Sequence, residues 1–175
     1  LVSKMANCVL TLNRLIIIRA KRRKRIININ TVNMQKDLCM KDIRIGSKAE
    51  IKWTVKTKDI ASFAKLSGDN NPLHMNKSFA IKKGFKDRVA HGLLLASKLS
   101  SLIGTKLPGK NCLLIEEKLA FPNPVYPNEK ILIKAKVDNI NRILNVLTLK
   151  IKGEKKEKNE TINVLRGTVI CKLLS

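Results

Sequence analysis

Three side chains able to exchange protons or hydrogen bonds with a substrate lie close together in residues 67–74, which read SGDNNPLH. Asp69 and His74 carry a carboxylate and an imidazole, which are common proton-transfer groups in catalysis. Asn71, between them, has an amide that both donates and accepts hydrogen bonds. Taken alone, Asp69 is equally well explained as a turn residue ahead of Pro72. The stretch therefore indicates acid–base chemistry only if other parts of the chain supply partners for it.

A second candidate lies at His91-Gly92, where the most apolar helix candidate of the chain, residues 92–106, begins. Lys98 is the only charge in this stretch before its last residue. This composition predicts a helix that protein encloses on most sides. The first N–H groups of a helix have no intrahelical acceptor and lie at the positive end of its dipole. We therefore expect the N–H groups at the start of this helix to be available to whatever binds there.

Short elements are expected to hold the polar loop. Residues 49–55 alternate apolar and polar side chains, as a strand with one buried face does. Residues 57–66 are expected to form a helix capped by Thr57 and ended by Pro72, since the residue before a proline disfavours helical geometry. A further short helix is expected at residues 77–83.

The second half of the chain is expected to form strands. Four candidates follow the apolar helix, at residues 112–121, 130–137, 144–152 and 162–173. The segments between them, 122–124, 139–141 and 153–160, are read as turns. Strands in succession make an antiparallel sheet, and one sheet curled around one buried helix covers that helix economically. The sequence therefore predicts an α+β fold, in a single domain over residues 42–175.

The first 41 residues differ from the rest in charge. They contain ten Lys or Arg and one acid, Asp37. Such a basic, acid-poor leader resembles a mitochondrial transit peptide, and we expect the protein in the mitochondrial matrix. The block Lys21–Arg25 is also compatible with a nuclear address or a nucleic-acid-binding arm. The apolar run at residues 15–18 is too short to span a membrane.

The expected domain also carries a surplus of positive charge. Residues 42–175 contain 26 Lys or Arg against 12 acids, and the whole chain has a formal net charge of +23. The surplus suggests an acidic partner, such as a nucleic acid, an anionic membrane or an acidic carrier protein. A lysine-rich composition with solvated faces explains it equally well.

Metal or disulfide chemistry is not indicated. The four cysteines lie far apart without a CxxC pair, and the two histidines are too few for a histidine-built metal site. We therefore expect neither a metal nor a cofactor.

Three motifs together carry a family resemblance. FAKLSGDNNPLH, AHGLLLASKLSSLIG and LAFPNPVYPNE resemble the R-specific enoyl-CoA hydratases, also called hydratase type 2 or MaoC-like dehydratases. The similarity covers about residue 51 to the C-terminus and is greatest to the mitochondrial 3-hydroxyacyl-thioester dehydratases of type 2. It implies a hot-dog fold, in which a curled antiparallel sheet wraps around a central helix, usually in a homodimer.

The resemblance also implies a reaction. The chain would be a hydro-lyase that reversibly removes water from (R)-3-hydroxyacyl thioesters of coenzyme A or acyl carrier protein, in mitochondrial fatty-acid synthesis. The reverse step, addition of water to the enoyl thioester, needs a base for the water, a proton for the α carbon and donors for the enolate-like oxygen.

Roles for individual residues follow from the same resemblance. Asp69 and His74 would hold one water, with His74 helping to activate it and Asp69 taking and returning the proton. Asn71 would support the water and the aspartate, and the N–H of Gly92 would be the oxyanion donor.

Three further residues are the implied substrate-binding residues. Leu94 belongs to the apolar residues that would form both core and acyl-tunnel wall, and Ser100 matches a position near the pocket. His91 and Ser100 are also explained as structural residues that bond to the backbone.

Two other functions remain as alternatives. A hot-dog acyl-thioesterase shares the fold and substrate class, but such enzymes usually need a carboxylate on or beside the central helix, and residues 92–106 contain none. A basic nucleic-acid-binding protein would fit the charge. Binding of single strands generally uses aromatic platforms, however, and Phe63 and Phe121 are expected to face inward. We therefore expect no specific nucleic-acid binding.

Overall fold

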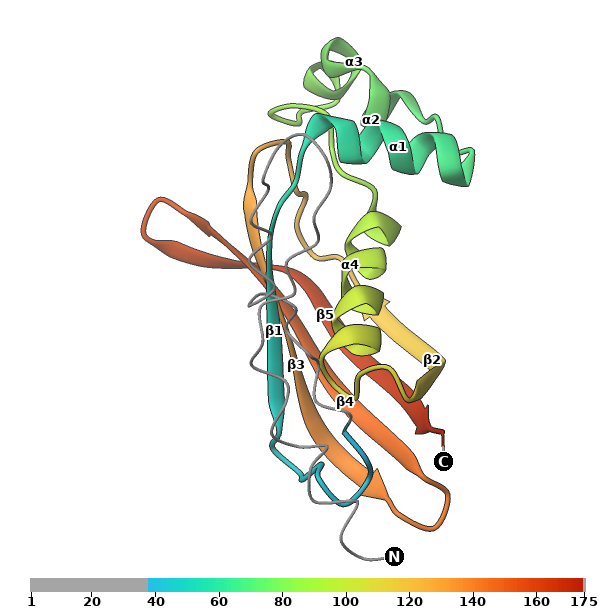
Figure 1. Cartoon of the computed structure of the whole chain (residues 1–175). Coiled ribbons are helices and arrows are strands. Elements are labelled where there is room, and N and C mark those ends of the chain that lie inside the picture. Colours follow the sequence, from blue (N-terminus) through green and yellow to red (C-terminus); the bar gives the residue numbers. More distant parts are fainter. Residues whose placement is uncertain (1–37, 175) are drawn as a thin grey trace, which may run out of the picture. The chain divides into compact units, whose positions relative to one another are not determined.

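The computed structural model describes residues 38–174. Its elements, labelled in Figure 1, are β1 (Lys48–Thr54), α1 (Thr57–Ser67), α2 (Pro72–Met75), α3 (Lys77–Lys82), α4 (Gly92–Thr105), β2 (Cys112–Ala120), β3 (Lys130–Asn141), β4 (Val146–Glu157) and β5 (Glu160–Leu173). The order of one strand, then helices, then four strands is the order predicted from the sequence.

All five strands form one sheet in the order β1-β3-β4-β5-β2, and every neighbouring pair is antiparallel. The long helix α4 lies along one face of this sheet, and α1, α2 and α3 gather beyond one end of it (Figure 1). β1 and β2 are the two edges. The predicted α+β architecture, a single antiparallel sheet with one long helix against it, is confirmed.

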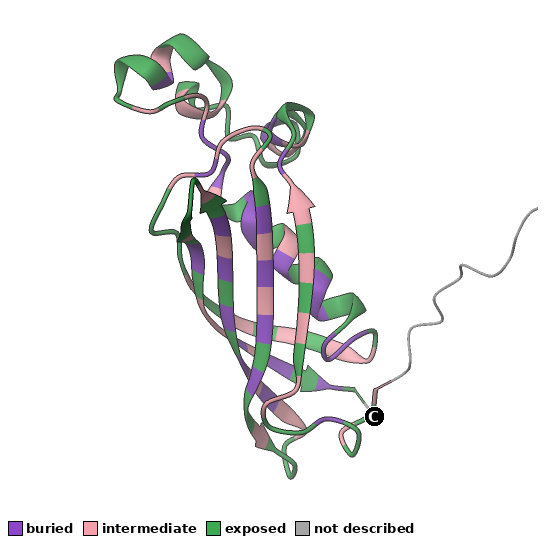
Figure 2. Cartoon of the chain, turned by 90° about the vertical axis from the view of Figure 1, so that its left-hand side faces the viewer, coloured by how far each residue is buried: buried purple, intermediate pink, exposed green. Residues whose placement is uncertain are grey.

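The core lies between α4 and the sheet. Burial alternates along β3 and β4, as Figure 2 shows, so that every second side chain of these strands faces the helix. Each aliphatic side chain buried in this way contributes about 1.5–3 kcal/mol by removal from water. The side chains that meet at the centre are Leu99, Leu102 and Ile103 of α4 with Ile133, Val137, Leu147 and Leu149 of the sheet.

α4 is less enclosed than its composition predicted. Its face toward the sheet is buried, but Leu93, Ser97, Ser100, Ser101 and Gly104 are exposed. The prediction of enclosure counted serine and glycine as residues that would be buried. Because they are small, they can be buried, but they are equally compatible with an exposed position. One face of α4 is therefore open within the described residues.

One predicted turn, at residues 139–141, is wrong, and another, at residues 153–160, is too long. Residues 139–141 belong to the end of β3, and the chain turns instead at residues 142–145, where Asn145 has a positive φ of 54°. Residues 153–157 continue β4, and the hairpin to β5 turns at Lys158, with a φ of 53°. The many charges of this hairpin suggested a loop, but charged side chains on the exposed positions of a strand are compatible with pairing.

The ends of α1 also differ from the prediction. The N-cap is Lys56, whose N–H donates to the side chain of Asp59 at 3.0 Å, whereas Thr57 is already helical. The helix ends at Gly68, which takes the left-handed conformation with φ 77° and donates to Ala64 O. Pro72 starts α2, where its missing N–H costs nothing.

The predicted leader lies almost wholly outside the described residues. Its last part, however, contacts the domain: Leu38 and Met40 pack against the core, and Arg142 donates a hydrogen bond to Met40 O at 3.0 Å. None of the helices in residues 38–174 is long and apolar enough to cross a membrane.

The three cysteines among residues 38–174 carry free thiols. Cys39 is exposed, whereas burial raises the pKa of Cys171 to about 12. Cys171 therefore stays protonated and is a core residue.

Candidate active site

The loop between α1 and α2 places Asp69 and His74 by local hydrogen bonds. Asn71 caps α2, because its Oδ1 accepts from Leu73 N at 2.9 Å. The N–H of Asn71 donates to Asp69 Oδ1 at 3.2 Å. The carboxylate is thus tied to the start of the same helical turn that carries His74.

His74 is held in one orientation by the segment that precedes α4. Its Nδ1 lies 2.7 Å from Val89 O, and since a carbonyl only accepts, Nδ1 carries the proton. In the neutral ring, Nε2 then has a free lone pair. This atom lies 3.9 Å from Asp69 Oδ2, which is too long for a direct hydrogen bond. The Asp69 side chain is 50% exposed and that of His74 only 14%, so the pair can be reached from the side of the carboxylate.

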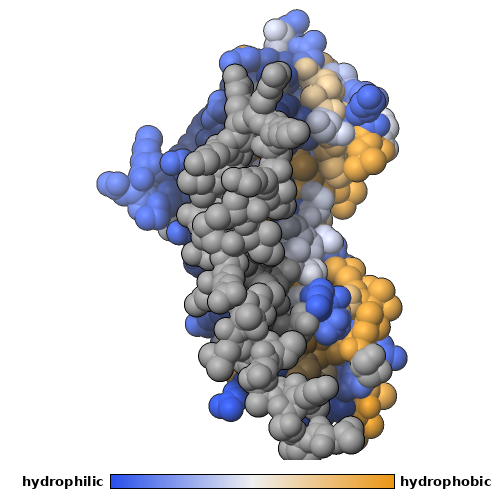
Figure 3. Space-filling model, in the orientation of Figure 1, coloured by the Kyte–Doolittle hydropathy of each residue, from blue (hydrophilic) through white to orange (hydrophobic). Residues whose placement is uncertain are grey.

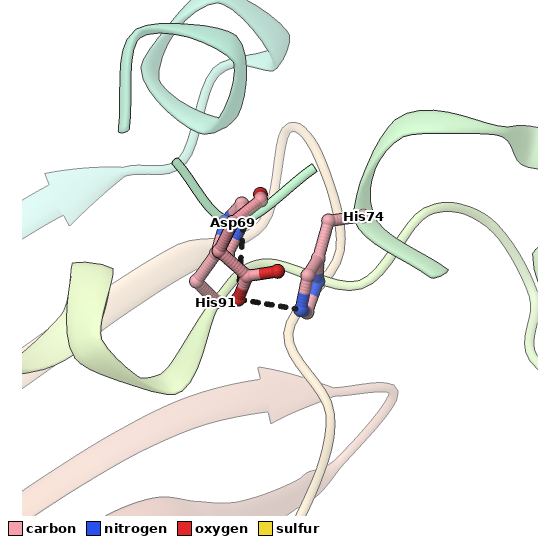
Figure 4. Close-up of side chains that lie close together, drawn as sticks. All are labelled: Asp69, His74 and His91. Atoms are coloured by element: carbon pink, nitrogen blue, oxygen red, sulfur yellow. Dashed lines mark hydrogen bonds and ion pairs between the residues drawn. The ribbon is translucent and has the colours of Figure 1, made fainter. Parts of the chain in front are cut away.

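His91 joins this pair from the N-cap of α4 (Figure 4). Its ring is 2% exposed and stacks on that of His74, with centroids 3.8 Å apart and 30° between the planes. Its Nε2 lies 3.0 Å from Asp69 O, so the ring donates to the backbone of the polar loop. The other ring nitrogen, Nδ1, has no partner among the described residues. His91 thus ties the loop of Asp69 to the beginning of α4.

The side chains of Asp69, His74 and His91 are the one group in residues 38–174 whose geometry resembles a metal site. One ligand atom from each lies within 4.8 Å of the others. A metal there would need a free nitrogen from each histidine. His91 Nε2 is engaged with Asp69 O and His74 Nδ1 with Val89 O, so the nitrogens left without a partner are His74 Nε2 and His91 Nδ1.

A pocket of about 340 Å³ joins His74 to the start of α4. Its wall is mostly apolar and comes from the loop before α4, from α4 and from the segment after β2: Phe85, Val89, Ala90, Gly92, Leu95, Phe121, Pro122, Asn123, Pro124, Val125 and Val164. The N–H of Gly92 has no acceptor within the described chain. His74 and Gly92 therefore line one pocket, and Asp69 lies beside His74 but is not part of the pocket wall.

A larger groove lies on the sheet and is lined by basic side chains such as Lys136, Lys150 and Arg166. It contains none of the predicted catalytic residues, and its size alone does not indicate chemistry.

Gly92 has a packing role as well. A Cβ at this position would lie 2.9 Å from Cδ2 of the Phe121 ring, so glycine is what lets this ring rest on the helix start. Phe121 is 39% exposed, and the expectation that it faces inward is wrong. The side chain covers the pocket and the first turn of α4 rather than filling the core.

The predicted substrate-binding residues are distributed unevenly. His91 contacts the polar loop, but Leu94 is buried in the core and its neighbour Leu95 lines the pocket. Ser100 lies on the exposed face of α4 and is not part of the pocket wall. Substrate contacts of Leu94 and Ser100 stay predictions.

The sequence reasoning missed the segment 121–125 as part of the site. The sequence predicts only a turn at residues 122–124. The signal that could have found it is the motif FPNPV itself, since two prolines fix a rigid, extended segment beside a glycine-led helix.

Known proteins with similar sequences and structures fit this site. The MaoC-like domain matches residues 42–161. A 3-hydroxybutyryl-CoA dehydratase of Methylorubrum extorquens is 34% identical over 100 residues, which are 57% of this chain and 64% of that protein. A mitochondrial 3-hydroxyacyl-[acyl-carrier-protein] dehydratase of Arabidopsis thaliana is 32% identical over 90 residues, which are 51% of this chain and 53% of that protein. The chain thus spans about half to two thirds of the length of these relatives.

The fold is shared with a solved structure, the (R)-hydratase of A. caviae involved in PHA biosynthesis. It superimposes with a TM-score of 0.70 at 30% identity, covering 75% of this chain and 97% of that one. The predicted hot-dog fold is confirmed by this similarity.

The capping role of Asn71 can be tested apart from any other role of its amide. Asn71→Ala removes the acceptor for Leu73 N–H, so hydrogen exchange of that amide should speed up and stability should fall by about 1 kcal/mol. Asn71→Ser keeps a capping oxygen and should behave like the unaltered protein. Equal exchange rates in all three proteins, measured by NMR, would show that Asn71 does not hold α2.

Proposed function

Since the chain belongs to the MaoC-like domain family, we propose that it is a hydro-lyase acting on thioesters. It would add water to 2-enoyl thioesters and remove it from (R)-3-hydroxyacyl thioesters. The observation that supports this most is the position of Asp69 Oδ2, 3.9 Å from the lone-pair nitrogen of His74, while His74 lines a pocket together with Gly92 at the start of α4.

Asp69 and His74 would share the proton transfer. In the hydration direction the water oxygen bonds to C3 of the enoyl thioester, one proton leaves the water, and one proton is added to C2 on the same face. A water seated between Oδ2 and Nε2 would donate to both acceptors, because the bond from Nδ1 to Val89 leaves Nε2 unprotonated. Dehydration reverses these steps.

The start of α4 would stabilise the charge that develops on the thioester oxygen. When C2 is a carbanion-like centre, that oxygen becomes enolate-like. The N–H of Gly92, at the positive end of the α4 dipole, is a fixed donor for it. The oxygen must approach beside Phe121, which already occupies the space next to Gly92.

Two lysines at the end of α3 support a carrier protein as the source of substrate. Lys82 and Lys83, at the end of α3, are exposed and form no ion pair within the described residues. Acyl carrier proteins are acidic, so these side chains would steer their docking. The Arabidopsis relative, named for acyl-carrier-protein substrates, is consistent with this proposal.

The catalytic proposal predicts the effect of two substitutions. Asp69→Asn and His74→Ala should each lower the rate of crotonyl-CoA hydration by roughly 100- to 10,000-fold, the usual contribution of a general acid or base. Asp138→Asn, which changes a carboxylate on the sheet, should leave the rate unchanged. The loss of absorbance of the enoyl thioester measures turnover.

Two results would contradict these proposals. Turnover of the unaltered protein no faster than that of both site variants would reject the catalytic assignment. Equal kcat/KM on coenzyme A and carrier-protein thioesters of the same acyl group would reject the preference for a carrier.

We also propose that the chain forms a homodimer through β2 and the open face of α4. β2 is an edge of the sheet, and Leu113 and Ile115 on it are 55% and 52% exposed. Leu93 on α4 is 66% exposed. Hydrophobic residues gather on the side where α4 and β2 lie (Figure 3). An unpaired edge flanked by apolar side chains is the kind of surface that a second copy covers.

A charge placed in this surface should separate the subunits. Ile115→Lys is expected to raise the dimer dissociation constant at least about tenfold, since burying an unpaired ammonium costs more than 1.4 kcal/mol. Ile143→Lys, on the turn between β3 and β4, is the matched control and should not. Sedimentation equilibrium gives the constants. A monomeric unaltered protein, or a dimer indifferent to Ile115→Lys, would refute the interface.

Residues 1–41 are proposed to direct the chain to mitochondria. Their basic, acid-poor composition and the mitochondrial relatives from Arabidopsis thaliana and Solanum lycopersicum support this location. A fluorescent protein fused to these residues should therefore be imported. Replacing the five basic residues Lys21–Arg25 by glutamine should reduce import. Accumulation of the fusion in the nucleus or cytosol would contradict the proposal.

A further inference from the structure

Lys155 of β4 is the only lysine or arginine buried in the described residues, with 4% of its surface exposed. An ammonium group removed from water is costly unless all three of its N–H groups find acceptors. Lys155 Nζ lies 2.8 Å from Pro124 O and 2.9 and 2.8 Å from the two carboxylate oxygens of Glu129. Its charge also lies 5.0 Å from the centre of the Tyr126 ring.

These bonds fix the segment that forms the pocket wall. Lys155 holds Pro124 directly, while Glu129 Oε2 accepts from Tyr126 N at 2.9 Å. Val125, between the two anchored residues, is 2% exposed and lines the pocket. The ion pair therefore clamps the wall on both sides of Val125.

The clamped wall is hydrogen-bonded to the peptide that orients His74. Val125 O accepts from Ala90 N at 2.7 Å, and Val89 O accepts from His74 Nδ1 at 2.7 Å. The carbonyl of Val89 and the N–H of Ala90 belong to one planar peptide group. A shift of Val125 would rotate this peptide and with it the acceptor of His74. Hydrogen bonds in such a chain also polarise one another.

We propose that Lys155 is a positioning residue for His74. Through Pro124 and Val125 it fixes the peptide between Val89 and Ala90, and this peptide fixes the tautomer and direction of the His74 ring. The consequence for catalysis rests on the proposed function, whereas the consequence for the His74 ring does not.

A purely structural role accounts less well for these contacts. Apolar residues of similar volume often replace a buried ion pair without loss of stability. Packing alone would not require an ammonium whose donors are divided between a side chain and one backbone carbonyl of the pocket wall. What the pair adds over an apolar contact is a fixed position for that carbonyl.

The test removes the pair without leaving a buried charge. In the double variant Lys155→Met/Glu129→Gln the amide oxygen can still accept from Tyr126 N, but nothing holds Pro124 O. The matched control is Lys134→Met/Glu154→Gln, which removes a lysine–glutamate ion pair of 2.7 Å between β3 and β4, away from the pocket. Lys155→Arg should largely keep the orientation of the His74 ring, since a guanidinium can donate to both Pro124 O and Glu129.

Two readouts separate positioning from stability. Nitrogen NMR of labelled histidines should show His74 protonated at Nδ1 in the unaltered protein and in the control, and a mixture of tautomers in the double variant. kcat on an enoyl thioester should fall by about 10- to 100-fold in the double variant, the scale expected for misplacement by about 1 Å, with KM changed less.

The outcomes are distinguishable. If the double variant keeps the His74 signals and kcat of the control and only melts earlier, Lys155 is structural and the proposal is overturned. If the signals change but the unaltered protein hydrates no enoyl thioester, the proposed function fails and the positioning role stands. Lys155→Gln, which keeps an NH2 group with two donors but no charge, serves if the double variant does not fold, and should give an intermediate tautomer mixture. Failure of both to fold would make Lys155 a folding residue and overturn the proposal.

Discussion

The hydrogen bond from His74 Nδ1 to the carbonyl of Val89 is the contact on which the candidate site depends. His74 sits on α2, which has only four residues, and a helix this short has no stability of its own in water. The orientation of the ring must therefore be imposed from outside the helix. Val89 does this at 2.7 Å, and the same bond leaves Nε2 as the acceptor that faces Asp69. Without it the carboxylate and the imidazole would be two exposed polar groups on a loop.

The candidate site lies on the loops and helix ends that connect the elements, whereas the stability of the fold comes from the apolar layer between α4 and the sheet. The apolar layer between α4 and the sheet contains none of the proton-transfer groups. Asp69 and His74 lie between α1 and α3, His91 and Gly92 at the start of α4, and the pocket wall between β2 and β3. A rigid layer that carries a polar site on its loops lets the polar groups stay partly solvated without weakening the core.

Sequence periodicity predicted the helices and strands but not which of their residues face the pocket and which face the core. The alternation over residues 49–55 and the apolar run of α4 were sufficient to predict a strand and a helix, whereas Asp69, His74 and Gly92 were singled out by the family motifs. Periodicity could not tell whether Leu94 or Leu95 lines the pocket, because the two differ by only 100° around the helix. The packing of α4 against the sheet determines which of them faces the pocket. Lys155 was hidden for a related reason. It lies in a run of charges, KGEKKEKNE, in which a buried lysine has the same appearance as a solvated one.

The strand order carries a consequence for how the protein assembles during translation. β2 pairs only with β5, although β3 and β4 lie between them in the chain. The nascent polypeptide therefore exposes β2 and the following wall segment until β5 has left the ribosome, long after Asp69, His74 and Gly92 have emerged. A message cut short before β5 would encode every residue proposed for proton transfer and still lack the strand with which β2 pairs.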